Sequence, residues 1–196
     1  MQPLSRRRLL YVAGLAPSLL LIAAPGPAAG GAVEPQMNDD GLYVQPWFLD
    51  SFLELRDDLD EAAAAGKRFA IIWELKGCPY CKETHLVNFA DPEINRFVRT
   101  HFAVLQLNII GSRKVTDFDG EVLEERHLAR KYGISFTPTI QFFPESGARL
   151  GEGRGRDLEV ARMPGYMRPA HFLAMFRFVQ ERAYESLGFR DYLKRG

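Results

Sequence analysis

Apolar residues in the first half of the chain follow two kinds of pattern. From Trp47 to Ala65 they recur at helical spacing, which predicts an amphipathic helix that stops at Gly66. Residues 68–75, RFAIIWEL, are a compact run of aromatic and β-branched residues, typical of a strand buried on both faces. Residues 102–110, FAVLQLNII, predict a second strand.

Helical segments separate and follow these strands. The residues after the second cysteine are predicted to stay helical as far as Asp91. Residues 92–101 predict a short helix with Pro92 in its first turn. Residues 111–122 are polar and predict a loop, and residues 121–133 predict another helix.

The last third of the chain predicts a hairpin and a closing helix. Residues 139–150 indicate a strand, a turn and the start of a returning strand, and residues 159–166 indicate one more extended piece. Residues 168–188 carry apolar residues at helical spacing, which predicts a long amphipathic helix. Strands that alternate with helices and finish in a hairpin indicate a mixed central sheet with helices on both faces.

Composition and charge narrow the possible classes of protein only slightly. The chain has 196 residues, of which 46% are hydrophobic, and this is enough for one sizeable core. Its 25 basic and 25 acidic residues cancel, so the charge balance indicates neither nucleic acid nor a strongly charged substrate. We therefore expect a single domain, a monomer, with one site and no nucleic-acid partner.

Residues 1–32 have the form of an export signal peptide. A basic start is followed by an apolar run, residues 9–24, and by a stretch of Pro, Ala and Gly. Glycine and proline interrupt the apolar run, which is shorter than the roughly 20 residues that span a bilayer. Residues 5–10, SRRRLL, resemble the twin-arginine export motif of bacteria. We expect cleavage near residues 28–32 and a periplasmic domain over residues 33–196.

The chain has two cysteines, Cys78 and Cys81, with two residues between them. An exported domain that uses disulfides as staples carries several cysteines at wide spacing. A bridge that closes so short a loop removes little entropy from the unfolded chain, so it stabilises the fold weakly. The pair therefore indicates redox chemistry and not a structural staple.

The predicted helix start assigns a role to each cysteine. If Pro79 takes the first helical position, Cys78 lies at the helix N-terminus, where unpaired N–H groups favour the thiolate. The Cys78 thiolate would attack a substrate disulfide, and Cys81 would then displace the substrate and leave a Cys78–Cys81 disulfide. These two residues are the predicted catalytic pair, and we expect no further cofactor.

A metal site is the alternative interpretation of the same stretch. Cys78, Cys81 and His85 could bind copper or zinc, since His85 lies one helical turn beyond Cys81. A structural zinc site needs a fourth ligand, and the other histidines are scattered along the chain. We therefore expect no bound metal, and we expect His85 to be an ordinary helix residue at the surface near the site.

The segments around the cysteines and around Pro138 resemble the thioredoxin fold. C-P-Y-C follows a predicted buried strand, and Thr137-Pro138 comes directly before the predicted strand TIQFF. The resemblance implies a cis Thr137–Pro138 bond, with Thr137 pairing to the substrate segment and Pro138 shaping the groove beside Cys78. It also implies substrate contact for Pro79 and Tyr80. The expected fold class is α/β: a thioredoxin fold whose mixed central sheet has helices on both faces and an extra N-terminal helix.

Within this fold the chain resembles the periplasmic thioredoxins of sulfur-oxidation gene clusters, the SoxW type. The N-terminal helix, residues 165–179 (GYMRPAHFLAMFRFV) and residues 189–194 (FRDYLK) carry the resemblance. It implies an exported thiol–disulfide oxidoreductase that reduces cysteine-containing periplasmic proteins and draws electrons from a membrane thiol transporter of the CcdA or DsbD kind. A disulfide oxidase or isomerase is the enzymatic alternative, because a C-x-x-C pair can run in either direction.

One position departs from the family pattern. Thioredoxins carry a buried Asp six positions before the first cysteine, and here Ile72 occupies that place. Glu74 lies two positions further on, so it would share a strand face with Ile72. We therefore interpret Glu74 as a candidate for proton transfer.

Overall fold

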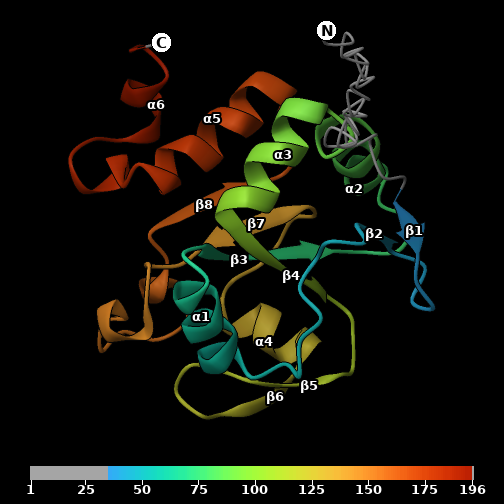
Figure 1. Cartoon of the computed structure of the whole chain (residues 1–196). Helices are drawn as coiled ribbons and strands as arrows, with labels where there is room; N and C mark the ends of the chain where they lie inside the picture. Colours follow the sequence, from blue (N-terminus) through green and yellow to red (C-terminus); the bar gives the residue numbers. More distant parts are fainter. Residues whose placement is uncertain (1–34, 196) are drawn as a thin grey trace, which may run out of the picture. The chain divides into compact units, whose positions relative to one another are not determined.

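The central sheet has four strands in the order β4-β3-β7-β8. These strands are β3 (Arg68–Glu74), β4 (Phe102–Asn108), β7 (Thr139–Phe142) and β8 (Ala161–Pro164). β3 runs parallel to β4 and antiparallel to β7, which pairs antiparallel with β8, so the predicted mixed sheet is confirmed. The computed structural model describes residues 35–195 (Figure 1), and the predicted export signal, residues 1–32, lies outside them.

Helices cover both faces of the sheet (Figure 1). α3 (Pro92–His101) and α5 (Pro169–Gln180) lie on one face, and α1 (Leu55–Ala64) and α4 (Glu125–Lys131) lie on the other. Every residue of β3 is buried, and its side chains alternate between the two cores. The run RFAIIWE is therefore the strand buried on both faces that its composition predicts.

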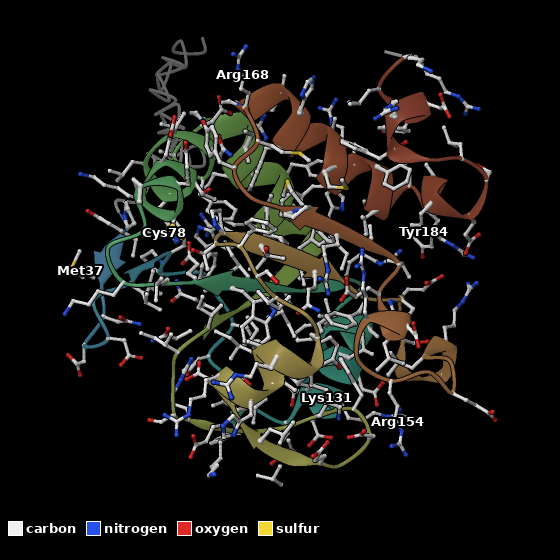
Figure 2. All side chains as sticks on the ribbon, turned by 180° about the vertical axis from the view of Figure 1, so that it is seen from behind. Met37, Cys78, Lys131, Arg154, Arg168 and Tyr184 are labelled. Carbon is white, nitrogen blue, oxygen red and sulfur yellow. A yellow bond between two sulfur atoms is a disulfide. The ribbon has the colours of Figure 1, made fainter. Side chains whose placement is uncertain are left out.

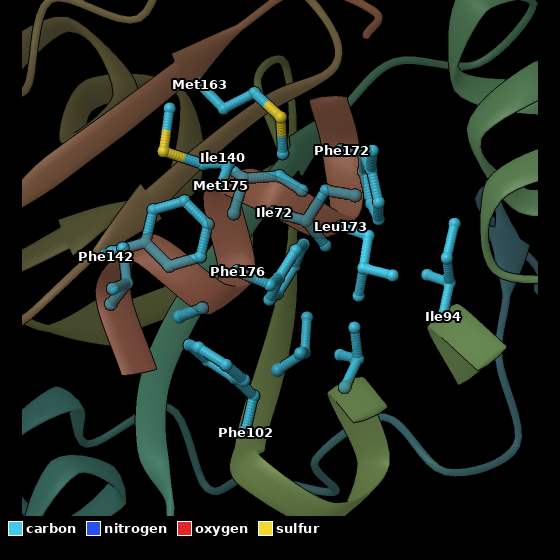
Figure 3. Close-up of a cluster of buried hydrophobic side chains, with 14 of the residues drawn as sticks. Ile72, Ile94, Phe102, Ile140, Phe142, Met163, Phe172, Leu173, Met175 and Phe176 are labelled. Atoms are coloured by element: carbon cyan, nitrogen blue, oxygen red, sulfur yellow. The ribbon is translucent and has the colours of Figure 1, made fainter. Parts of the chain in front are cut away.

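Phenylalanine side chains pack among aliphatic ones in the core between the sheet and α5 (Figure 3). Phe176 packs edge-on against Phe102 and Phe142, with ring centroids 4.8 and 5.1 Å apart. Ile72 lies in the same cluster and is fully buried. Each such side chain stabilises the fold by about 1.5–3 kcal/mol on burial. The place where thioredoxins keep a buried Asp is thus an apolar core position in this chain.

Local sequence accounts for several helix ends. The Asp91 carboxylate accepts hydrogen bonds from the backbone N–H groups of Glu93 and Ile94, and Pro92 takes the first position of α3. After α1, Gly66 adopts a left-handed conformation with φ of 69°, which is why the helix stops where the sequence predicts.

The start of α1 differs from the prediction. The helix begins at Leu55, eight residues after the expected start at Trp47. The segment ahead of it binds the edge of the sheet instead, because the Leu49 N–H donates to the Val104 carbonyl of β4. Phe52, an apolar residue within the helix predicted from Trp47 to Ala65, is 98% exposed.

Residues 111–122 are not a simple loop. Two short strands, β5 (Lys114–Thr116) and β6 (Val122–Glu124), pair antiparallel in this part of the chain. α4 consequently begins at Glu125 and not at residue 121, because Val122 and Leu123 are held in β6.

The prediction of a returning strand directly after β7 is also wrong. Residues Gly147–Arg149 form a 3-10 turn, tied to α1 by the Gly147 N–H, which donates to the Asp60 carboxylate. The partner of β7 is β8, which belongs to the extended piece predicted at residues 159–166. α5 ends at Gln180, short of the predicted end at residue 188, and short helical turns at Ala183–Glu185 and α6 (Phe189–Tyr192) follow.

A small hairpin that the sequence did not indicate precedes the domain's first helix. Its strands are β1 (Gln36–Met37) and β2 (Tyr43–Val44). The turn between them needs Gly41, whose φ is 72°. Among the helices of residues 35–195, none combines the length and the apolar character required to cross a membrane.

Candidate functional site

The two cysteines lie where β3 gives way to a helix. Cys78 is the N-cap of α2 (Pro79–Glu83), with Pro79 in the first helical position. Cys78 and Cys81 form a disulfide, with Cα atoms 5.3 Å apart. Cys81 is buried, at 4% exposure, whereas Cys78 is partly exposed. An incoming sulfur can therefore reach Cys78 more readily than Cys81.

The helix start also supplies a donor to the sulfur of Cys78. The backbone N–H of Cys81 donates to Cys78 Sγ at 3.1 Å. Once the disulfide is reduced, the same N–H would stabilise a thiolate at this sulfur, because a charge-assisted hydrogen bond is stronger than a neutral one. This asymmetry favours Cys78 as the nucleophile.

The loop before β7, which carries Pro138, lies next to the disulfide. The Thr137–Pro138 peptide bond is cis, as the family resemblance implies. The carbonyl oxygen of Thr137 lies 3.5 Å from Cys78 Sγ. The Pro138 carbonyl accepts a hydrogen bond from Gly165 at 2.7 Å, so the end of β8 holds this loop in place.

Exposed aromatic side chains lie next to residues of the site in the sequence. Tyr80 is 56% exposed and Phe136 is 67% exposed, and each is close in sequence to a residue of the site. The ring of Tyr80 stacks with that of Tyr166, with centroids 6.2 Å apart. Burial and the neighbouring Glu83 carboxylate raise the pKa of Tyr166 above its usual value. Pro79 is also exposed.

Glu74 closes β3 and is almost completely buried. Both of its carboxylate oxygens face His85 Nε2, at 3.1 and 3.0 Å. The Gln106 side-chain amide donates to Glu74 Oε2 and, at 2.6 Å, to the Tyr43 carbonyl. The carboxylate is therefore held by His85, which follows α2 in the chain, and by Gln106 of β4.

His85 is fully buried, so the prediction of an ordinary surface residue is wrong. It lies in a π-helical turn, Thr84–Asn88, in which the Phe89 N–H reaches back to the Thr84 carbonyl. This wider turn follows α2 directly and carries the imidazole to Glu74. A helix wheel drawn from sequence assumes regular α geometry, and it does not indicate this burial.

Gln45 completes the polar cluster behind the disulfide. Its side-chain Nε2 lies 3.2 Å from His85 Nδ1 and 3.4 Å from the His85 carbonyl oxygen. Neither Gln45 nor Gln106 was predicted from the sequence to belong to the site. A signal existed for Gln106, since a polar residue in the middle of a strand predicted to be buried needs a partner.

A cavity of about 410 Å³ is lined by both cysteines and by Glu74. The hairpin β1–β2 forms one wall of it, with Met37, Leu42 and Tyr43, and the stretch from Glu74 to Lys82 forms the other. Figure 2 shows Met37 and Cys78 at the same edge of the domain, away from Lys131 and Arg154. The unpredicted hairpin is therefore part of the site.

The geometry does not favour the metal alternative. His85 directs one ring nitrogen to Glu74 and the other to Gln45. Within residues 35–195, no group of three His, Cys, Asp or Glu side chains is arranged to hold a metal ion. His85 thus serves the buried cluster instead of joining Cys78 and Cys81 as a third ligand.

The mixed sheet and the C-P-Y-C disulfide facing a cis-proline define the class of thioredoxin-fold proteins. The family comparison makes this specific: residues 55–180 match the thioredoxin-like domain model, and the chain belongs to that family. No curated protein matches the chain.

Of three solved structures that resemble the chain, the first shows the same fold. A thioredoxin-fold protein from Helicobacter pylori is 21% identical with a TM-score of 0.51, and the match covers 71% of this chain and 92% of that one. A thioredoxin from Thermus thermophilus is 26% identical with a TM-score of 0.48, covering 64% and 83%. The C-terminal domain of DsbD from Neisseria meningitidis, in its oxidised form, is 17% identical with a TM-score of 0.44, covering 63% and 90%.

Proposed function

We propose that the protein is an exported thiol–disulfide oxidoreductase that reduces disulfides of cysteine-containing periplasmic proteins. One observation carries this proposal: a partly exposed Cys78, with the Cys81 N–H on its sulfur, forms a disulfide with a buried Cys81 opposite Pro138. A disulfide between residues three apart closes a short loop and contributes little stability, so chemistry is the better reason for it.

The reaction begins on the reduced dithiol. The Cys78 thiolate attacks one sulfur of the substrate disulfide, a new S–S bond forms, and the other substrate sulfur leaves as a thiolate that takes up a proton. Cys81 then loses its proton and attacks Cys78 Sγ. The mixed disulfide breaks, the second substrate sulfur leaves and is protonated, and Cys78–Cys81 becomes the disulfide. Two electrons have passed from the protein to the substrate.

The surroundings of Cys78 suit an extended segment of a partner protein. Thr137 would pair with that segment through its backbone, and Pro138 would shape the groove beside the sulfur. Tyr80, next to Pro79, and Phe136, two residues before Pro138, offer exposed aromatic surface, and Pro79 is exposed as well. Glu74, which lines the cavity with both cysteines, would accept the proton that Cys81 gives up.

The biological setting extends the proposal. The protein would work as a periplasmic monomer of the SoxW type, after removal of residues 1–32. A membrane thiol transporter of the CcdA or DsbD kind would return two electrons to the Cys78–Cys81 disulfide. The dithiol itself would be the redox group, with no further cofactor. A disulfide oxidase or isomerase is the enzymatic alternative. The direction of electron flow between the protein and its substrates distinguishes it from a reductase.

Trapping of the mixed disulfide tests the mechanism. The Cys81→Ser variant, mixed with a protein that carries a reducible disulfide, is expected to accumulate a covalent adduct that dithiothreitol releases. The matched Cys78→Ser variant is expected to form none, because the buried Cys81 is shielded from the substrate. Adduct formation through Cys81 alone would reverse the assigned roles, and no adduct with either variant would contradict the proposed activity.

A further inference from the structure

A buried imidazole and a buried carboxylate face each other behind the disulfide. His85 and Glu74 both lie almost entirely out of solvent. A buried carboxylate without hydrogen-bond donors tends to take up a proton, and it can then accept no other. The donors around Glu74 therefore decide whether it is ready to receive the proton of Cys81.

The partners of His85 identify which of its ring nitrogens carries hydrogen. Gln45 Nε2 faces both the Nδ1 of His85 and the carbonyl oxygen of the same residue. Only the NH₂ end of the amide suits that carbonyl, because an amide oxygen there would face another oxygen. The Nδ1 atom thus accepts a hydrogen bond, and the hydrogen of the neutral ring is on Nε2, which points at Glu74.

We propose that His85 is a positioning residue: fixed in the Nε2–H form by Gln45, it donates to Glu74, keeps this side chain a carboxylate, and so sets the pH at which Cys81 can resolve a mixed disulfide. The inference rests on the proposed exchange reaction and deepens it, since it names the group that prepares the proton acceptor. Gln106 contributes the second donor to the same carboxylate.

Three cationic side chains near the cluster are placed differently from His85. Lys76 and Lys82 line the cavity together with Glu74 and the cysteines, and both lysines are exposed. Arg113 donates to the Gln106 carbonyl and to Glu125, so its charge is paired on the far side of β4. None of these three cations is a hydrogen-bond partner of Glu74, whereas His85 contacts both of its oxygens.

The proposed path for the proton follows the cavity that Cys81 and Glu74 line. Its volume of about 410 Å³ is large enough for several water molecules, and Cys81 and Glu74 both line it. When the Cys81 S–H bond breaks, the proton passes through water to a Glu74 oxygen while the sulfur keeps the electron pair and attacks Cys78. The resulting carboxylic acid returns its proton to the cavity water after the substrate leaves.

A reaction with the aromatic disulfide dithiobis(nitrobenzoate) separates the two steps. The reduced protein releases one coloured thionitrobenzoate when Cys78 attacks and a second when Cys81 resolves the adduct. The rate of the second release, followed from pH 5 to 9 by stopped flow, is the readout. In His85→Leu, its midpoint is expected to rise by about one pH unit, so that the second release is about tenfold slower below the midpoint. The first release is expected to be unchanged.

Two further variants distinguish hydrogen bonding from packing. His85→Gln retains an N–H donor for Glu74 and is expected to restore the wild-type midpoint. Gln45→Met keeps His85 but removes the amide that donates to its Nδ1. The midpoint of the second release is expected to rise by a smaller amount, about half a pH unit. Unchanged midpoints in His85→Leu and Gln45→Met, or equal shifts in His85→Leu and His85→Gln, would overturn the role of His85. Release of a single thionitrobenzoate by the wild type would contradict the exchange reaction itself.

Discussion

The two faces of the sheet each bury a glutamate near the ends of β3 and β4, and the two serve different purposes. Glu74 lies on the face of α3 and α5, and Glu125, the first residue of α4, lies on the face of α1 and α4. Glu125 accepts hydrogen bonds from the backbone N–H groups of Asn108 and Arg113 and from the Arg113 guanidinium. It ties three segments of backbone together.

Glu74 has no backbone donor among its partners. His85 and Gln106 hold it through their side chains, and it lines the same cavity as the cysteines. Burial of an acidic group is therefore not in itself a sign of chemistry. What distinguishes Glu74 is that side chains alone hold its carboxylate and that the residue lines a cavity together with a redox pair.

The largest expected effect is on stability and concerns Glu125. Replacement by Gln removes the charge and turns one oxygen into an NH₂ group that faces N–H donors, so the free energy of unfolding should fall by about 2–3 kcal/mol. The rates of both thionitrobenzoate releases should stay as in the wild type. Denaturant unfolding with parallel exchange assays checks this, and a loss below about 0.5 kcal/mol would show that Glu125 is not a structural tie.

A third buried carboxyl, Asp58, shows what happens when donors are few. Burial raises its pKa to about 6, and a hydrogen bond from the Ser51 hydroxyl only partly opposes this shift. Between about pH 4 and pH 6 the folded protein keeps a proton that the unfolded chain has lost, so stability should fall by about 2 kcal/mol as pH rises through this window.

The Asp58→Asn variant should lack this fall. Its free energy of unfolding is expected to exceed that of the wild type by about 2 kcal/mol at pH 7 and to match it near pH 4. Urea titrations of both proteins at the two pH values make the comparison. An equal pH dependence in variant and wild type would mean that Asp58 ionises normally in the fold.

Glu74→Gln is expected to slow the exchange reaction more than it lowers stability, which is the reverse of the expectation for Glu125→Gln. Without a proton acceptor, resolution by Cys81 should slow by about tenfold near pH 7, while attack by Cys78 stays unchanged. The free energy of unfolding should fall by less than in Glu125→Gln, because a single amide oxygen at the place of Oε2 can still accept from both His85 and Gln106, whereas the donors to Glu125 are divided between its two oxygens. Equal slowing of both steps would show that Glu74 supports the site's structure and not proton transfer.

The smallest expected effect concerns the rim of the site. Phe136→Ser should raise the KM for a protein disulfide about threefold with little change in kcat, since it removes exposed aromatic contact surface. Phe52→Ser is the matched control, because Phe52 is also highly exposed but lies on the segment before α1. Equal changes in both variants would remove Phe136 from the partner surface.

The elements that local patterns determine were predictable from the sequence. β3 has the residues of a doubly buried strand, and Pro92 and Gly66 mark helix ends through their own backbone preferences. The cis bond before Pro138 followed from the family resemblance. The helix start at Cys78 followed from Pro79.

Tertiary packing determined the rest. Residues near Leu49 bind the edge of β4 in place of continuing a helix, and no periodicity shows that preference. His85 is buried because a π-helical turn directs it inward, and Gln45 reaches it from a segment 40 residues away. The disulfide could be predicted, but the cluster behind it depends on contacts distant in sequence.

The equilibrium between the Cys78–Cys81 disulfide and its dithiol, measured in a defined thiol buffer, tests the central claim most directly. The proposed reductase predicts a reversible two-electron transition at a potential near that of thioredoxin, about −270 mV. A value near −120 mV would make the protein a disulfide donor, contrary to the proposed direction. A pair that forms no disulfide at any ratio of thiol to disulfide would contradict the redox function altogether.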